Sequence, residues 1–565
     1  MANSSSGSTK DATTIVEAGL DATMHGDEAE LARMGYKQEL KRDLSLMQNF
    51  GVSFSIISVI TGVPSLFLYG LTTGGPGVMV WGWVVVSCFT LLVGLAMAGQ
   101  HTPVFNVANH SSIARGLQRT SDQRRSLFLG SHAFKTPKCR VCILDHRLVQ
   151  PARTSCRYDC FACANFISTA STLGTDYVPS ANKTIGIYAG VLCAQGLINT
   201  FGVHLLKYLN NISVWWHAIG TVSLVIAILA KAPTHQSGKF VFATFIDGTG
   251  VDGVGWSERA SPAYVAVIGI LMAQYTLTGF DASAHMTEET HNAAMSGSIG
   301  IVMAIGVSAL LGWFLILGLL FSIQDYDNTI ASATGQPVTQ IFLDTVGEKG
   351  AIVLMVIVVG AMFFCGTFSI TSNSRMMYAF SRDGAIPGFF HKVDKRWKSP
   401  IRTVWLACTL SFILGLPSLG SSVAFSAATS IATIGLYISY AIPIALRVVY
   451  ADQFVRGPFH LGMFSFPVAI AAVTWIAFIS IVFVLPELNP VNSQTLNYAI
   501  VAVGIVLTYS LGFWLVSARK WFTGPVKQIA GTWSSDSASL STCGPEGQGI
   551  NITDPAAMAE KPGYD

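Results

Sequence analysis

Residues 50–77 read FGVSFSIISVITGVPSLFLYGLTTGGPG and decide the fold class. The apolar part is long enough to cross a lipid bilayer, which takes about 20 residues of helix. Small, hydroxyl-bearing and helix-breaking residues interrupt it: Ser55, Ser58, Thr61, Gly62 and Pro64. A membrane tolerates a broken helix only where the break lies against packed protein or a cavity. The stretch therefore predicts a transmembrane helix with a break at membrane depth.

A second interrupted run occupies residues 261–290, SPAYVAVIGILMAQYTLTGFDASAHMTEET. It is broken at Thr276, Thr278 and Gly279, and Asp281 lies at the edge of its apolar part. Corresponding breaks in the two halves of a carrier point to a substrate site at the bilayer midplane, where half-helix N-termini attract a carboxylate. The alternative is that Gly and Ser only let membrane helices pack closely. Because the breaks fall five spans apart, the pair favours a transporter with inverted repeats.

The rest of the chain has the composition of a membrane protein. Of the 565 residues, 51% are hydrophobic and 12% are charged, whereas soluble domains have about 25% charged residues. The mean hydropathy is +0.50, which argues against a soluble enzyme. The net charge of +3 is too small to predict a nucleic-acid partner. Ten Cys in so long a chain do not indicate a disulfide framework.

Apolar runs of membrane-spanning length recur along the chain. There are eleven: Phe50–Leu71, Val78–Ala98, Ile185–Val203, Ile212–Leu229, Ala263–Phe280, Ser298–Ile323, Ala351–Ile370, Val404–Leu419, Ala424–Leu446, Phe464–Leu485 and Leu496–Val516. A twelfth survives only as a stump, Phe161–Leu173. The polar flanks predict a disordered cytosolic tail over residues 1–45, a transmembrane domain over 46–520 and a second tail over 521–565.

Basic residues predict the orientation. Three groups belong in the cytosol by the positive-inside rule: Lys37, Lys41 and Arg42; Arg375, Arg382, Lys392, Lys395, Arg396, Lys398 and Arg402; and Arg519, Lys520 and Lys527. The first two groups can share a side only if an even number of spans separates them, yet seven clean runs do so. One span is therefore missing or disguised. Arg375, Arg382 and Asp383 are expected in a structural turn.

The segment Gly99–Cys160 does not resemble its neighbours. Arg, His, Ser and Cys replace Leu, Val and Gly there, and no helical or strand period can be counted. Cys139-x2-Cys142 followed by Cys156-x3-Cys160 roughly resembles zinc-ligand spacing. No pattern of a small metal domain flanks these cysteines, so no metal site is predicted.

Codons compatible with residues 115–157, read one nucleotide later, can spell a membrane-like sequence. We interpret residues 99–160 as aberrant, from a retained intron followed by a frameshift that disrupts the third helix.

Four stretches carry a family resemblance: SVITGVPSLFLYGLTTGGPGVMVWGW, GFDASAHMTEET, TSNSRMMYAFSRDGAIP and SIATIGLYISYAIPIALRV. They resemble the amino acid, polyamine and organocation superfamily, and within it the amino acid/choline transporter branch, which includes fungal GABA permeases and plant bidirectional amino-acid transporters. The likeness covers Leu44 to Pro525, excepting residues 99–160. It implies an all-α polytopic membrane protein with twelve transmembrane helices. The first ten would form two inverted five-helix repeats with broken helices 1 and 6.

The resemblance also implies a substrate site. Five residues match the unwound part of helix 1, whose backbone amides bind the substrate carboxylate in relatives: Ser58, Val59, Ile60, Thr61 and Gly62. Five match the unwound part of helix 6, whose carbonyls receive the amine: Tyr275, Thr276, Leu277, Thr278 and Gly279. Tyr275 falls where relatives place an aromatic gate.

Two ionisable residues are candidates for proton coupling. Asp281 falls where many relatives carry an acid tied to gating or proton movement, and a charge at such depth is costly. The alternative is a helix-end carboxylate at the interface. His217, in NNISVWWH, lies where some proton-coupled relatives carry Lys, and His titrates near physiological pH. The alternative is a satisfied core histidine. Glu288 and Glu289 are expected on a solvated cytosolic face, with a gating role as the alternative.

These features predict a secondary active transporter, or permease, for amino acids or GABA, with alternating access and protons as the coupling ion. One alternative is a choline or polyamine permease, for which an added acid in the site would be expected. Another is a non-transporting nutrient receptor, which usually has a longer tail. HExxH, GxSxG and Walker A motifs are absent, so no enzyme activity, cofactor or ATP-driven pumping is expected. The expected location is the plasma membrane, or alternatively the vacuole or another internal membrane, with both termini cytosolic.

Overall fold

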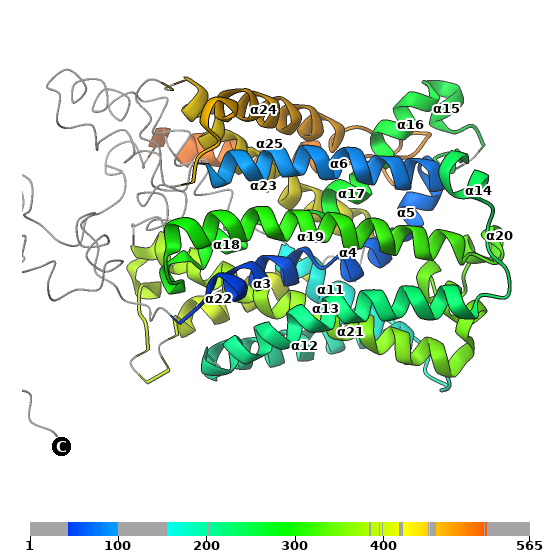
Figure 1. Ribbon diagram of the computed structural model, residues 1–565, viewed down its shortest axis with the longest axis horizontal. Helices are drawn as coiled ribbons and strands as arrows, with labels where there is room; N and C mark the ends of the chain where they lie inside the picture. Colours follow the sequence, from blue (N-terminus) through cyan, green and yellow to red (C-terminus); the bar gives the residue numbers. More distant parts are fainter. Residues whose placement is uncertain are drawn as a thin grey trace, which may run out of the picture.

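The computed structural model describes residues 43–99 and 155–516, apart from positions 202, 252, 383–385, 395, 398, 417–421, 450, 452–458 and 514. Within these ranges the secondary structure is helical, with isolated β-bridges and no strand. The long helices run roughly along one common axis (Figure 1), as the need to satisfy every backbone group inside a bilayer demands. The predicted all-α fold class is confirmed.

The first half of the bundle begins with a helix in three pieces: α3 (Leu46–Ile57), α4 (Val59–Ser65) and α5 (Phe67–Thr72). Its remaining long helices are α6 (Gly75–Ala98), α11 (Ser155–Ala170), α12 (Ala181–Phe201) and α13 (Val203–Lys231). Two short helices, α14 (Gly238–Ala243) and α15 (Trp256–Arg259), lie in the connection to the second half.

The second half repeats this order. Its first helix is again divided, into α16 (Pro262–Gly269), α17 (Leu271–Thr276) and α18 (Ala282–His285). The turn η2 (Thr287–Glu289) and then α19 (Ala293–Phe321), α20 (Tyr326–Ile330), α21 (Pro337–Arg382), α22 (Ile401–Gly415) and α23 (Ser422–Val449) follow. Two helices complete the described bundle, α24 (Ser465–Val482) and α25 (Ala499–Phe513).

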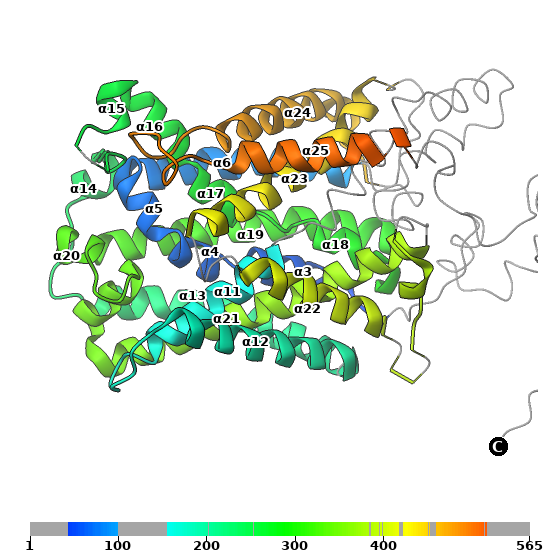
Figure 2. The ribbon, with the colours of Figure 1, turned by 180° about the vertical axis from the view of Figure 1, so that it is seen from behind.

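Corresponding helices of the two halves pack against each other. The pairs are α3 with α18, α6 with α19, and α11 with α21. The divided helix α3–α4 crosses the middle of the bundle, with α19 on one side and α13 and α21 on the other (Figure 1). Helices α24 and α25 lie together along one side (Figure 2), where they pack on α23. This arrangement is the one that two inverted five-helix repeats predict.

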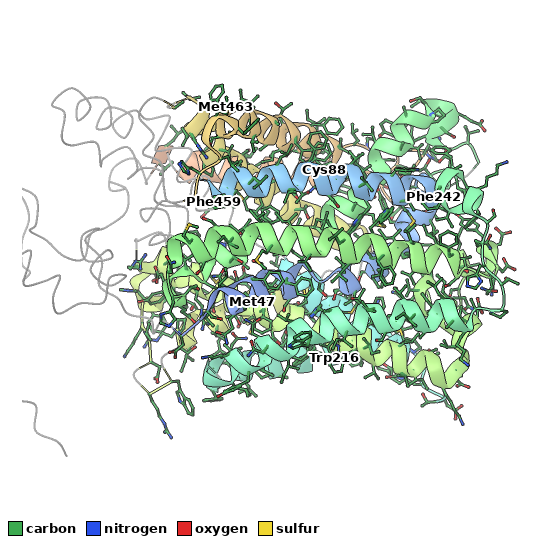
Figure 3. All side chains as sticks on the ribbon, viewed as in Figure 1. Met47, Cys88, Trp216, Phe242, Phe459 and Met463 are labelled. Carbon is green, nitrogen blue, oxygen red and sulfur yellow. The ribbon has the colours of Figure 1, made fainter. Side chains whose placement is uncertain are left out.

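The outer surface of the bundle is apolar. On α13, Trp215, Ile219 and Ile226 are 57–64% exposed along one helical face, while Leu224 and Ile228 are fully buried. Figure 3 shows Cys88 and Trp216 in the middle part of the bundle, where carbon atoms cover the helices. Seven described helices are long and apolar enough to cross a membrane, and five shorter apolar helices accompany them. The chain is therefore an integral membrane protein.

Several helices have other bounds than the apolar runs that predicted them, and α13 and α11 are two of these. Helix α13 begins at Val203 and not at Ile212, because the polar turn before Ile212 continues the helix and Asn210 donates a hydrogen bond to the carbonyl of Gln48. Helix α11 begins at Ser155 and not at Phe161, and Cys160 is fully buried. The last residue of the segment interpreted as aberrant, Cys160, therefore packs into the bundle.

Much of the aberrant segment and of both predicted tails lies outside the described residues. The last residues of the predicted N-terminal tail are described, and they are bound. The amides of Asp43 and Leu44 both donate to the carbonyl of Glu289, and Ser45 caps α3 through a hydrogen bond with Gln48. The ordered domain therefore begins before residue 46.

Candidate functional site: two helix breaks that meet

The break in the first helix consists of one residue. Ser58 has φ 36° and ψ 75°, a left-handed conformation that non-glycine residues rarely adopt. Val59 to Gly62, which were expected to be unwound, instead form the first turn of α4, and the amides of Thr61 and Gly62 donate to the Ser58 carbonyl. The amides of Val59 and Ile60 occupy the first two positions of α4, where no preceding helical carbonyl can accept them.

The break in the sixth helix is longer and lies further along the chain than expected. Helix α17 ends at Thr276, α18 begins at Ala282, and Gly279 has φ 95°, which favours glycine. Tyr275 and Thr276 are therefore helical, and the non-helical stretch is 277–281. In the last turn of α17, the carbonyls of Ala273 and Tyr275 accept from the amides of Leu277 and Thr278. The carbonyl of Thr276 lies beyond the last helical amide and can accept a hydrogen bond from an amine.

The two breaks lie directly against each other. A Cβ atom added to Gly62 would come within 2.6 Å of Thr276 Cγ2, and one added to Gly279 within 2.6 Å of Ile56 Cγ2. Two glycines thus permit the close approach on either side of the break. The structure brings together the two segments that the sequence singled out, and their role in substrate binding stays a prediction.

His217 is hydrogen-bonded to the first break. Its Nδ1 lies 2.7 Å from the carbonyl oxygen of Ser213, which can only accept, so Nδ1 carries a hydrogen. Its Nε2 lies 2.9 Å from the Ser58 hydroxyl, which lies 2.5 Å from the Thr61 hydroxyl. The imidazole is 2% exposed. A change in the protonation of His217 therefore reverses the hydrogen bond with Ser58, because Nε2 accepts when neutral and donates when charged.

Asp281 lies at the other break. Its Oδ2 is 3.0 Å from His285 Nε2, one helical turn further along, and both side chains are 1% exposed or less. The structure therefore places Asp281 in the buried bundle and not at an exposed helix end. His285 is a neighbour that the sequence interpretation missed, although the four-residue spacing in DASAH could have indicated it.

A small cavity adjoins the sixth-helix break. Its volume is about 20 Å³, and its walls come from α3, the break, α21 and α23: Ile56, Gly279, Asp281, Ala282, Ser369, Ser372, Asn373 and Leu436. A cavity needs a volume of about 10–15 Å³ to hold one water molecule. The described conformation therefore has room there for a water molecule and not for an amino acid.

Two ion pairs join η2 to the end of α21. Arg375 Nε lies 2.9 Å from Glu289, and Arg382 lies 3.1 Å from Glu288. The four side chains are between 2% and 16% exposed, so a solvated face is the wrong interpretation for the glutamates. The seven-residue spacing puts both arginines on one face of α21, but it does not identify the glutamates as their partners.

Gln274 is a second residue that sequence reasoning missed. It is fully buried in α17, next to the predicted gate residue Tyr275. Its side chain hydrogen-bonds with the Tyr437 hydroxyl of α23 and accepts from Trp475 Nε1 of α24 at 3.0 Å. These bonds tie the half-helix before the break to two neighbouring helices. A glutamine inside the apolar run ILMAQYT was the available signal.

At the end of the bundle opposite the pairs Arg375–Glu289 and Arg382–Glu288, the loop around Asp247 packs against the end of the first divided helix. Asp247 accepts hydrogen bonds from Thr249 and Ser257. Burial raises its pKa, but these hydrogen bonds outweigh burial and hold the pKa below its usual value. The backbone of residues 246–248 pairs with that of Thr72 and Gly74. Helices α5, α14, α15 and α20 lie at this end (Figure 1).

The described residues contain no group of three or more potential metal ligands. Cys139 and Cys142, from the zinc-like spacing, lie outside those residues. The thiol of Cys160 donates to Gln195 at 3.0 Å and is thereby engaged in the packing of α11 against α12.

The chain is similar to known permeases. A family model described as amino acid permease matches residues 158–507. The amino-acid permease BAT1 of Arabidopsis thaliana is 40% identical over 525 residues, covering 90% of this chain and 97% of the relative. The rice BAT1 homolog (Oryza sativa subsp. japonica) is 41% identical over 530 residues, covering 89% and 96%. The GABA-specific permease of Saccharomyces cerevisiae is 30% identical over 515 residues, covering 89% and 86%.

Proposed function

Since this chain belongs to the amino acid permease family, we propose that it is a secondary transporter that carries amino acids or GABA. The similar proteins are amino-acid permeases and a GABA-specific permease by name. A carrier, and not an enzyme, is what this family membership indicates.

The meeting of the two helix breaks is the observation that carries the proposal. The amides of Val59 and Ile60 at the start of α4 are donors suited to a carboxylate. The carbonyl of Thr276 at the end of α17 is an acceptor suited to an ammonium group. The contact between Gly62 of α4 and Thr276 brings the two half-helices together. Such a pair of groups matches a zwitterion, because each charge of the substrate meets the opposite backbone dipole.

Protons are proposed as the coupling ion, with His217 and Asp281 as the residues that carry them. His217 is bonded to the break itself, so that its charge is felt where the substrate carboxylate would bind. Asp281 is hydrogen-bonded to His285, which favours a zwitterion over choline or a polyamine, since the acid already has a partner. The proposed location is the plasma membrane, with both termini in the cytosol.

Residues 99–160 are proposed to be a translation of the wrong reading frame. The match to the family model begins at residue 158, where this segment ends. Experiments on transport should therefore use the full-length protein that the sequenced transcript encodes.

The decisive experiment is uptake by cells that express the full-length protein encoded by the sequenced transcript, with labelled amino acids, GABA and choline offered in turn. Uptake of at least one amino acid or of GABA, stimulated by an acidic medium and abolished by a protonophore, is expected. Choline should compete poorly. Transport of choline alone would overturn the amino-acid assignment, and binding without uptake would favour a receptor.

A further inference from the structure

The pair Asp281–His285 is a buried titratable unit at the far end of the second break. Asp281 precedes α18 and His285 is its last residue, with 3.0 Å between Oδ2 and Nε2. With the imidazole neutral, the pair has a net charge of −1. With one more proton it is a carboxylate beside an imidazolium, with no net charge. A buried site favours the uncharged combination, because a net charge loses its hydration there.

The elements packed against α18 bring few other charges. Helices α3 and α19 carry no titratable side chain. Near this end, α21 carries Arg375 and Arg382, which pair with Glu289 and Glu288 of η2. The remaining titratable groups on these elements are Cys365, whose thiol donates to the Ile56 carbonyl, the buried Tyr378, and Asp344, Glu348 and Lys349 near the other end of α21. A proton taken up by Asp281–His285 therefore changes the net charge of a region whose other charges are balanced.

The cavity beside Asp281 supplies a place for a proton carrier. Its volume of about 20 Å³ fits one water molecule. Across it from Asp281 lies Ser372, which is 2% exposed and whose hydroxyl has no hydrogen-bond partner among the described residues. Buried hydroxyls are rarely left without a partner, and ordered water is a usual one. The amide of Asn373 adds a further polar group to the wall.

We propose that one water molecule binds in this cavity between Asp281 and Ser372, and that it carries the proton which the Asp281–His285 pair exchanges with the side where Arg375 and Glu289 lie. The inference rests on the proton-coupled transport proposed above. In the balanced step, the imidazolium of His285 passes its Nε2 proton to Oδ2 of Asp281, and the Asp281 carboxyl gives a proton to the water in the cavity. The water then releases a proton toward the side where Arg375 and Glu289 lie, and the pair regains its single negative charge. His217 then serves the substrate site, and His285 serves proton release.

The test uses the transcript-encoded protein in liposomes that contain a pH-sensitive dye. Two assays are run side by side: substrate-driven proton movement, and exchange of labelled for unlabelled substrate, which needs no net proton transfer. The variants are His285→Gln, Asp281→Asn and Ser372→Ala. The controls are His391→Gln, a histidine near the same end, and Ser381→Ala, a buried serine of α21 outside the cavity.

His285→Gln should slow proton movement about a hundredfold or more, at the lower end of the effects for a lost proton-transferring group, while exchange continues. Ser372→Ala should slow it less, and the dependence of the rate on the pH inside should flatten in both. The controls should behave as the unmodified protein. Unchanged proton movement in His285→Gln would overturn the pair, and unchanged movement in Ser372→Ala would overturn the water. Loss of exchange together with proton movement in both His285→Gln and Asp281→Asn would show a structural role instead.

The unmodified protein separates this inference from the function on which it rests. Exchange and uptake without any proton movement would overturn the proposed proton coupling. Proton-coupled uptake with a normal His285→Gln variant would leave that function standing and overturn only the route through Asp281 and His285.

Discussion

The imidazole Nε2 of His217 lies 2.9 Å from the hydroxyl oxygen of Ser58, the residue whose left-handed backbone separates α3 from α4. A protonation change at His217 therefore acts directly on the residue that ends one half-helix and precedes the next. The Ser58 hydroxyl also contacts Thr61, in the first turn of α4. Protonation and the position of the free α4 amides are thus linked through one serine.

Neutralising His217 should separate accumulation from exchange. In His217→Asn, no proton can bind at this position, so accumulation of substrate against its gradient should be lost while exchange of labelled for unlabelled substrate continues. Ser58→Ala should keep proton-dependent accumulation but shift its dependence on pH, because Nε2 loses its hydrogen-bond partner. Uptake into cells across a range of external pH measures both. Wild-type accumulation and pH profile in His217→Asn would place the proton route elsewhere.

The contact between Gly62 and Thr276 should be intolerant of a methyl group. In Gly62→Ala the new Cβ would lie 2.6–3.0 Å from three Thr276 side-chain atoms, so the breaks must move apart. Overpacking of this kind costs about 1–3 kcal/mol, and substrate affinity should fall with it. Thr276→Ala should partly restore affinity in the double variant. The control is Gly190→Ala in α12, where a Cβ meets nothing within 4 Å. Equal binding by Gly62→Ala and Gly190→Ala would contradict the close approach.

Breaking the pair Arg375–Glu289 should open the end of the bundle at which it lies. Arg375 is 2% exposed, and removing one partner of a buried ion pair costs about 3–5 kcal/mol. Arg375→Gln leaves Glu289 unpaired, and the double variant with Glu289→Gln should recover part of the loss. Reaction of a cysteine introduced at Asn373 with a soluble thiol reagent measures the opening. Arg402→Gln is the control, since Arg402 lies over Phe389 in an exposed position.

The loop that follows α24 should loosen as the pH rises. Burial raises the pKa of Glu487 from 4.5 to about 7, so the docked loop prefers the neutral carboxyl. The stabilisation is fully present below pH 4.5 and is lost as the pH rises through about 7. Asp247 behaves oppositely: its lowered pKa gives stability that is lost only as the pH falls through that lowered value. The protection of residues 486–497 against hydrogen exchange, after correction for the base-catalysed rise of the intrinsic exchange rate, should therefore be lower at pH 8.5 than at pH 5.5.

Glu487→Gln should remove this pH dependence, while Glu348→Gln, at an exposed acid of α21, should keep it. Protection, corrected in this way, that stays the same over this pH range in the unmodified protein would contradict the raised pKa.

The sequence predicts the helices better than the contacts between them. Apolar runs located the described spans, because a bilayer selects for length and hydropathy. The start of α13 was missed because its polar first turn continues the helix and binds Gln48. The break at 277–281 was placed two residues early, since Tyr275 and Thr276 still belong to α17 and the positive φ of Gly279 lies inside the non-helical stretch. The pairs Arg375–Glu289 and Arg382–Glu288 join residues 86 and 94 positions apart, a separation that no local pattern reveals.

The last prediction concerns residues 99–160. Six charged groups would fall within or beside a span if this segment formed the third helix: Arg140, Asp145, Arg147, Arg153, Arg157 and Asp159. Each costs about 2.5–3.5 kcal/mol at the centre of a membrane helix. No pairing offsets six such groups, so the segment should stay in water.

The chain in its present reading frame should therefore transport poorly or not at all, since the later helices would face the wrong side relative to their basic loops. Sequencing the transcript tests the cause directly. A spliced message that encodes PTSGG and a continuous third helix, together with transport by its product, is expected. One feature of α11 fits this view: it has 16 residues, fewer than the roughly 20 that a span needs. Its middle part nevertheless packs against the core, where Cys160 and Cys163 are fully buried. A transcript with only the present frame, whose product transports robustly, would show that the cysteine-rich segment is a genuine part of the protein.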